Sequence, residues 1–353
     1  MRSIKNYIKE IVSILLISII SLLCIEGFSS ILVILLDNSS SVPHEVHYTK
    51  YDELLGWANI PNIEIMDVYG PGIYLKNNSQ SFRNNKDFSI SIPKEKIRII
   101  CSGDSFTHGD GVDNEHTWCQ QLTSIDNHLE TINVGQSGYG IDQAYLWYMR
   151  DGKKFEHNIQ IFAFVIDDFY RMENSRYNGL YSKPILKLIN NELEVKNIPV
   201  SIYPYLFPKL TQLVNCFDDF RFYGLFNTIR NKICLSKHDM DFKENIELQK
   251  VTLKVFDNLD KANKEKNSNL VLVLLPEHES LFNYDSDSLR KLLSKEMAKR
   301  KIVFIDMFDE FENLPSYELK SLFLTNDPHY SEKGNKFVAN ILYKNLYSLH
   351  ILK

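Results

Sequence analysis

Two short segments of the chain carry side chains that could cooperate in nucleophilic catalysis. A Gly-Asp-Ser segment ends at Ser105, directly after an apolar run, and Asp327 and His329 flank a proline far along the sequence. A serine at a tight turn can present its hydroxyl as a nucleophile, and the backbone N–H groups of the turn can hold an oxyanion. A histidine beside an aspartate can act as a general base whose ring the carboxylate orients. Each segment alone could equally be a capping turn.

A glycine-rich turn from Gly135 to Gly140 follows another apolar run. Glycines allow the backbone to approach a ligand closely, although such a segment by itself indicates no more than a turn. The order of the predicted strands and helices determines whether this turn lies near Ser105 and His329.

Five apolar runs of strand length alternate with helical stretches. The runs do not alternate between apolar and polar residues, which is typical of strands buried on both faces. The predicted strands are residues 97–101, 131–134, 159–166, 270–275 and 302–305, and the predicted helices are 116–125, 142–150, 246–266, 286–299 and 333–347. This alternation predicts an α/β fold, a three-layer α/β/α sandwich with a five-stranded parallel sheet. Ligands bind at the carboxyl ends of such strands, so the three segments are expected at one edge of the sheet.

The first part of the chain predicts a membrane anchor. Residues 11–36 form an apolar run with a single charge, Glu26. At about 1.5 Å per residue the run can cross a hydrocarbon core of about 30 Å. Basic residues in the ten positions before it favour a cytoplasmic tail, residues 1–10, and an extracytoplasmic remainder. A cleaved signal peptide is the alternative.

The remainder divides into three predicted parts. Residues 37–96 contain many turn signals and predict a linker followed by an irregular apron. Residues 97–353 form the predicted α/β domain, with an insertion at about 170–241. Asn190-Asn191 lies between two apolar runs of that insertion and predicts a β-hairpin.

Composition excludes several classes of protein. The chain has 353 residues, of which 44% are hydrophobic and 24% charged, so it is neither disordered nor fibrous. A net charge of -5 without a basic run argues against nucleic acid as a partner. The five cysteines lack zinc spacing, and no phosphate-binding glycine loop occurs, so no cofactor is expected. His108, Asp110 and Asp113 could ligate a metal, but a polar loop is the favoured interpretation, and no metal site is predicted.

Taken together, the segments resemble the SGNH (GDSL-like) hydrolases, of a membrane-anchored bacterial type. The match covers residues 97–347: the Gly-Asp-Ser block, the glycine block from Asn133 to Gly138, and an Asp-x-His block. The resemblance implies a flavodoxin-like sheet. It also implies that Ser105 is the nucleophile, His329 the general base and Asp327 its orienting acid, with the amides of Ser105 and Gly138 in the oxyanion hole.

One block departs from the family's pattern. Its third motif is Gly-x-Asn-Asp, and here Asp167 occupies the position of the asparagine that donates to the oxyanion. Losing one such donor typically costs about 10²–10³ in rate. Asp167 is therefore protonated, or turned away to bind Arg171 or the substrate, or catalysis is weak. Asp104, Asp168 and Arg171 are predicted to contact the substrate, and Glu277 with His278 could border the site.

The expected function is a membrane-anchored serine esterase or O-acyl transferase. Its expected substrate is an acylated carbohydrate of the cell envelope or of a secreted polysaccharide, or another small ester. Transfer would need an acyl donor delivered through a membrane partner. The alternative is a non-catalytic polysaccharide-binding or assembly protein, which Asp167 favours and the retention of Ser105, Asp327 and His329 disfavours. A phosphate-binding protein is a weaker alternative, because the Asp104 carboxylate would repel the anion.

Overall fold

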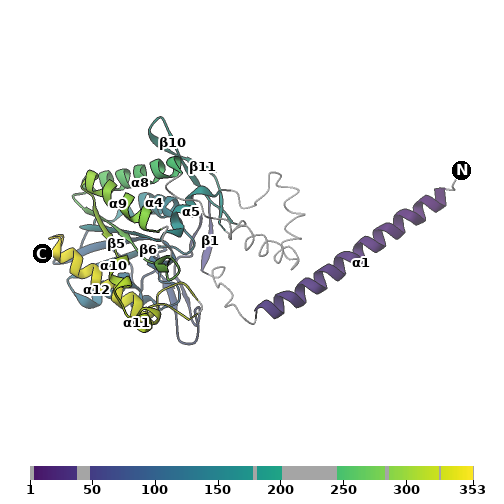
Figure 1. Ribbon diagram of the computed structural model, residues 1–353, viewed down its shortest axis with the longest axis horizontal. Coiled ribbons are helices and arrows are strands. Elements are labelled where there is room, and N and C mark those ends of the chain that lie inside the picture. The colour runs from purple at the N-terminus through teal and green to yellow at the C-terminus, as the bar shows by residue number, and fades with distance from the viewer. Residues whose placement is uncertain are drawn as a thin grey trace. The chain divides into compact units, whose positions relative to one another are not determined.

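The computed structural model describes residues 4–37, 48–177, 181–200, 245–282, 286–325 and 327–352. The chain divides into two compact units, which are described separately. The described part of the first unit is helix α1 (Ile4–Asp37). The second contains all other described residues and forms an α/β unit (Figure 1).

Helix α1 is long and apolar enough to cross a membrane. Its stretch Lys9–Phe28 has a mean hydropathy of 2.5, and none of it is buried against other parts of the structure. Twenty residues of helix span about 30 Å, the thickness of a hydrocarbon core. A secretory signal sequence meets the same criterion of length and composition.

The α/β unit is built on a five-stranded parallel sheet. Its strands are β5 (Ile97–Gly103), β6 (Leu129–Gly135), β7 (Ile159–Phe164), β12 (Asn269–Leu274) and β13 (Val303–Asp306). Their order is β13-β12-β7-β5-β6, with every neighbouring pair parallel. The predicted fold class is thus confirmed, since this is the flavodoxin-like order. The chain reverses its direction of winding next to β5, the strand that leads to Ser105.

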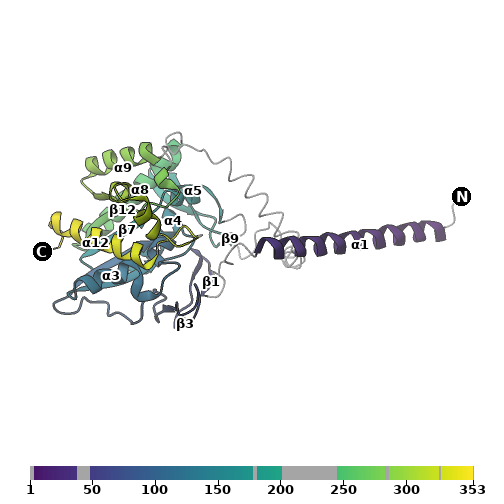
Figure 2. The same ribbon diagram turned by 60° about the horizontal axis from the view of Figure 1, so that its bottom comes forward.

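Helices cover both faces of the sheet. One face carries α4 (Ile141–Arg150), α8 (Ile246–Lys264) and α9 (Ser286–Arg300), and the other carries α3 (Trp118–Ile125), α11 (Ser316–Ser321) and α12 (Glu332–Ser348). The short helix α10 (Phe308–Glu312) contributes Phe308 to the core of the first face and Phe311 to that of the second. Figures 1 and 2 show these two layers. Within β12, Leu272 packs into the first layer and Val273 into the second. Strands buried on both faces therefore explain the unbroken apolar runs.

Two short helices at the carboxyl edge of the sheet escape the sequence pattern. They are α2 (Ser105–His108) and α5 (Asp167–Glu173), which follow β5 and β7 directly. Single 3₁₀ turns occur at Asn114–His116, Gly152–Lys154 and Ser280–Phe282.

The apron, residues 48–96, belongs to the α/β unit. It contains the antiparallel pairs β1 (Thr49–Asp52) with β2 (Gly56–Asn59), and β3 (Ile63–Ile65) with β4 (Leu75–Asn77). The fully buried Arg83 side chain donates to the carbonyls of His108 and Gly109, at 2.8 and 2.6 Å. The apron therefore braces the loop that follows α2.

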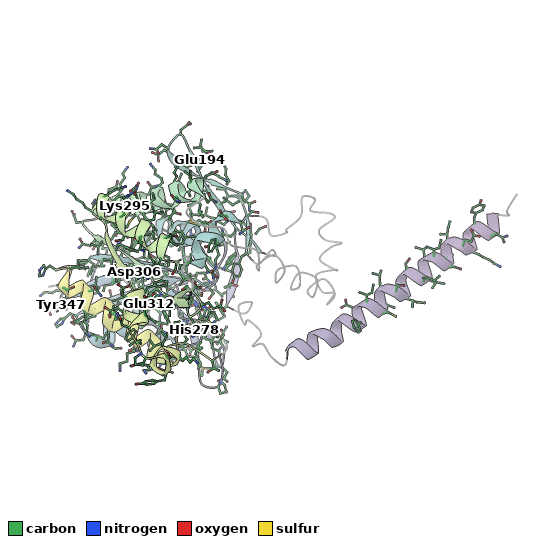
Figure 3. The ribbon with its side chains drawn as sticks, viewed as in Figure 1. Glu194, His278, Lys295, Asp306, Glu312 and Tyr347 are labelled. Atoms are coloured by element: carbon green, nitrogen blue, oxygen red, sulfur yellow. A yellow bond between two sulfur atoms is a disulfide. The ribbon has the colours of Figure 1, made fainter. Side chains whose placement is uncertain are left out.

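The described part of the insertion contains the predicted hairpin. Strands β8 (Arg176–Tyr177) and β9 (Tyr181–Ser182) pair first, followed by β10 (Ile185–Ile189) with β11 (Glu192–Lys196), which carries Glu194 in Figure 3. Asn190 and Asn191 make its turn with φ angles of 51° and 63°, the left-handed region that asparagine tolerates. Residues 178–180 and 201–241 of the predicted insertion lie outside the described residues.

A disulfide joins Cys101 on β5 to Cys119 on α3. The scattered spacing of the cysteines predicts no such bond, because the two thiols meet only when α3 packs on the sheet. Both residues are fully buried. The crosslink ties the strand that leads to Ser105 to the helix layer behind it.

Replacing both Cys101 and Cys119 with alanine should lower the free energy of unfolding by about 3 kcal/mol. A crosslink that closes a loop of roughly this length removes that much chain entropy from the unfolded state. The measurement is urea unfolding of the full chain in detergent, with the exposed Cys24→Ala as control. Equal unfolding midpoints for the oxidised and the dithiol forms would contradict the role of the bond.

Candidate active site

Ser105 sits at the turn between β5 and α2. Asp104 caps the helix by accepting a hydrogen bond from the Phe106 backbone N–H at 3.0 Å. A Cβ on Gly103 would lie 2.3 Å from the Ala163 carbonyl oxygen and from Thr107 Oγ1, so only glycine fits there. The turn therefore places the serine where the strand ends, and its side chain stays 6% exposed.

His329 approaches Ser105 from the segment before α12. The distance between His329 Nε2 and Ser105 Oγ is 2.8 Å, although 224 positions separate the residues. On the other side of the ring, His329 Nδ1 lies 2.6 Å from Asp327 Oδ1, which also accepts the His329 backbone N–H at 2.9 Å. The Phe106 ring packs on the imidazole with a centroid separation of 4.9 Å. Serine, histidine and aspartate thus form one continuous hydrogen-bonded chain.

The charges around His329 favour its protonated form. Burial lowers its pKa, but the hydrogen bond that the ring donates to Asp327 and the charges of Asp110, Asp327 and Asp104 outweigh burial, so the pKa lies above the usual value. Burial raises the pKa of Asp327, but its hydrogen bond with His329 outweighs burial. The pKa of Asp327 therefore lies below its usual value. Asp327 therefore remains an acceptor, which fixes the proton of the neutral ring on Nδ1 and leaves Nε2 to accept the serine proton.

Two backbone N–H groups of the segments that follow β5 and β6 have no acceptor in the described part of the chain. Among the described residues, the amides of Ser105 and Gly138 donate to no protein acceptor. The Gln136 N–H donates to the Gly103 carbonyl at 3.2 Å, which ties the glycine turn after β6 to the end of β5. Gly138 has a φ of +76° and lies under Tyr177. These free donors at adjoining strand ends could hold an oxyanion.

Asp167 is the first residue of α5, and its side chain is exposed. Arg171 does not pair with it. The Arg171 guanidinium instead lies 2.8 Å from Asp168 and 3.7 Å from Asp104, and it donates to the Tyr139 carbonyl at 3.0 Å. Within the described ranges no ion pair or hydrogen bond of the Asp167 carboxylate is found. Pairing with Arg171 is therefore not the arrangement that this chain adopts.

The three residues predicted to contact substrate occupy different depths. Asp104 and Asp168 are each 1% exposed, and Asp168 accepts the Val165 backbone N–H at 3.1 Å. Both buried carboxylates thus accept hydrogen bonds from backbone N–H groups and lie close to the Arg171 guanidinium. The Arg171 side chain is partly exposed, so it is the one of the three that a ligand could reach.

Several carboxyl groups surround the single positive charge of Arg171. Burial raises the pKa of Glu277 to about 8, and the negative charge of Asp167 raises it as well. Burial also raises the pKa of Asp104 to about 6, against the charges of Arg171 and His329. Part of the cluster is consequently protonated near neutral pH. His278, which is labelled in Figure 3, follows Glu277. Its ring packs on Phe323 with a centroid separation of 5.2 Å.

A second polar cluster lies behind the glycine turn, and we name it the Asp110 network. His108 Nδ1 lies 2.6 Å from Asp110 Oδ1, and the Ser137 hydroxyl donates to both Asp110 oxygens at 2.7 Å. The hydroxyl of Tyr69 donates to Asp110 at 2.9 Å, and that of Tyr48 lies 2.9 Å from Ser137 Oγ. The sequence indicates only that His108 and Asp110 follow the turn at Ser105. The two tyrosines reach them from the apron.

The three loop residues considered as metal ligands do not converge. His108 and Asp110 bond to each other inside the Asp110 network. Asp113 instead caps the following 3₁₀ turn and lies 2.9 Å from His116, with Glu332 nearby at the surface.

Comparisons with known proteins give likenesses to solved structures. No family model and no curated protein matches the chain. It is similar to a member of the lipolytic protein G-D-S-L family from Veillonella parvula DSM 2008, at 12% identity over 70% of this chain and 97% of that one, with a TM-score of 0.41. It is also similar to an acetyl xylan esterase at 16% identity, over 71% and 100% of the two chains, with a TM-score of 0.40. A lipase/acylhydrolase from Enterococcus faecalis matches at 10% identity, over 71% and 95%, with a TM-score of 0.40.

Proposed function

We propose that this chain is a serine esterase of the SGNH type, with Ser105 as nucleophile, His329 as general base and Asp327 as its orienting acid. The observation that carries the proposal is the unbroken hydrogen-bonded chain Ser105–His329–Asp327. The backbone amides of Ser105 and Gly138, which have no protein acceptor among the described residues, would supply the oxyanion donors that acyl transfer requires.

The reaction follows from these positions. Ser105 Oγ attacks the ester carbonyl carbon while its proton passes to His329 Nε2, and the amides of Ser105 and Gly138 stabilise the oxyanion. The carbon–oxygen bond to the alcohol then breaks, and the alcohol leaves with the proton from His329. An acyl-serine remains. Water, or a sugar hydroxyl in a transferase, loses its proton to His329 as it attacks the acyl carbon, and Ser105 is released.

The location and the substrate are part of the same proposal. The apolar stretch of α1 and the basic residues near the start of the chain support a single-pass anchor with the α/β unit outside the cytoplasm. The Cys101–Cys119 disulfide supports this side of the membrane independently, because such bonds persist in oxidising compartments. An extracytoplasmic esterase meets acylated polysaccharides of the envelope. Acyl transfer onto such a polymer would draw its acyl group from a membrane partner.

The second candidate is a binding or assembly protein that keeps the fold without turnover. It is favoured by one observation, the exposed Asp167 carboxylate at the position where the family has a donor. A negative charge near the reacting carbonyl would oppose an oxyanion.

A serine-reactive fluorophosphonate probe separates the two candidates. The wild-type chain should be labelled, Ser105→Ala should not, and the exposed control Ser91→Ala should be labelled like the wild type. Labelling requires a serine activated by its base, so a wild-type chain that stays unlabelled under conditions where it is folded would leave the binding protein as the better proposal.

The replacement Asp167→Asn should raise kcat for a small ester, because it restores a neutral donor and removes a charge. The family's donor is typically worth about 10²–10³ in rate, which sets the upper limit of the gain. The matched control is Asp168→Asn, which should lower kcat since Asp168 holds Arg171 and the Val165 amide. Unchanged or reduced turnover by Asp167→Asn would mean that this carboxyl is protonated or binds substrate.

A further inference from the structure

The Asp110 network lies directly behind the proposed oxyanion hole. We propose that Asp110 is a positioning residue, whose buried carboxylate anchors Ser137 and thereby fixes the turn that presents the Gly138 amide. This inference rests on the esterase function proposed above. It adds a residue that touches neither the substrate nor the reacting atoms.

The donor set around Asp110 shows that its carboxylate is charged and fully engaged. Hydrogen bonds from His108, Ser137 and Tyr69 converge on it at 2.6 to 2.9 Å. Burial raises the pKa of Asp110. The hydrogen bonds from His108 and Ser137, together with nearby histidine charge, outweigh burial, so the pKa of Asp110 lies well below its usual value. Asp110 itself is 6% exposed and His108 is fully buried. Hydrogen bonds to a charged acceptor in such surroundings are stronger than those in water.

Ser137 transmits this anchoring to the site because it directly precedes Gly138. The Ser137 hydroxyl donates a hydrogen bond to Asp110. The hydroxyl of Tyr48, in the apron, forms a second hydrogen bond with Ser137 Oγ. The Ser137 carbonyl accepts the Trp57 indole N–H at 3.0 Å. The turn is thus held from two sides, and Asp110 supplies the charged contact. A displacement of such a donor by about 1 Å can lower the rate by about 10²-fold.

The same carboxylate also acts on the general base through space. The groups that face His329 are the Ser105 hydroxyl, the Phe106 ring and the carboxylates of Asp327 and Asp104. His108 adds an opposing charge when it is protonated, and its own pKa is lowered by burial. Asp110 adds negative charge and raises the pKa of His329. Removing that charge should lower the pKa of His329, an effect that a structural role alone would not produce.

The test compares Asp110→Asn and Ser137→Ala with the wild-type full chain in detergent, using a small acyl ester. Asp110→Asn should lower kcat by about 10- to 100-fold with KM nearly unchanged. It should also move the acid limb of the pH–rate profile to lower pH. Ser137→Ala should lower kcat while leaving the acid limb in place, since the carboxylate remains. Asp113→Asn, an acid of the same loop that still caps its turn, is the control and should match the wild type.

The outcomes separate the two proposals. A folded Asp110→Asn chain with wild-type kcat and an unmoved acid limb would overturn the positioning role alone. If Asp110→Asn does not fold, Ser137→Ala decides, and wild-type kcat in that variant would overturn the role. A wild-type chain that turns over no ester and is not labelled at Ser105 would instead remove the proposed function, and the positioning role with it.

Discussion

Replacing Ser105 with alanine should lower the turnover of a small acyl ester by about 10⁴- to 10⁶-fold. The loss is this large because Ser105 supplies the only oxygen that His329 Nε2 contacts among the described residues. Asp327→Asn should lower kcat by a smaller factor than Ser105→Ala, because the base His329 remains and only its orientation is lost. The measurement is initial-rate kinetics at a pH above the raised pKa of His329.

The fold should survive the Ser105→Ala change, because only a hydroxyl is removed. Circular dichroism and the unfolding midpoint of Ser105→Ala should therefore match those of the wild-type chain. Residual turnover above about one part in a hundred by a folded Ser105→Ala chain would show that another group is the nucleophile.

The second large effect concerns stability. Lys183, at the start of the insertion, is fully buried and forms a 2.5 Å ion pair with Asp142 in the first turn of α4. Its ammonium also donates to the Pro184 carbonyl at 3.1 Å. Lys183→Met should lower the free energy of unfolding by about 3–5 kcal/mol, because it leaves the buried Asp142 without its partner. Urea unfolding of the full chain in detergent measures the change.

Two controls make this prediction specific. The double variant Lys183→Met/Asp142→Leu should recover much of the loss, since no uncompensated charge then remains. Lys187→Met, in the following strand β10, removes an exposed pair with Glu247 and should cost no more than about 1 kcal/mol. Equal losses in Lys183→Met and Lys187→Met would show that burial does not govern the pair.

The sheet and the meeting of Ser105 with His329 could be predicted because both depend on local signals joined by one topological rule. Each strand is an uninterrupted apolar run, and parallel strands bring their carboxyl ends to a single edge. The helices α2 and α5 escaped this reasoning because they have 4 and 7 residues, too few to show a 3.6-residue period.

The Asp110 network and the disulfide could not be predicted, for a different reason. Tyr48 and Tyr69 reach Asp110 from the apron, where short strands and turns leave no periodic pattern. Cys101 and Cys119 carry no spacing that pairs them. In both cases the partners are chosen by non-local packing, which is set only after the layers have formed.

The contacts of the apron also determine how short an active fragment of this chain can be. Arg83 fixes the loop after α2, and Tyr48 and Trp57 hold the glycine turn through Ser137. A fragment that begins at residue 97 would keep the whole sheet and the Ser105–His329 pair, yet lose three supports of the loops around that pair. Removal of α1 by cleavage before Tyr48 would leave every one of these supports in place. Cleavage before Tyr48 is therefore expected to preserve the proposed esterase activity, whereas trimming to the bare α/β core is expected to reduce it.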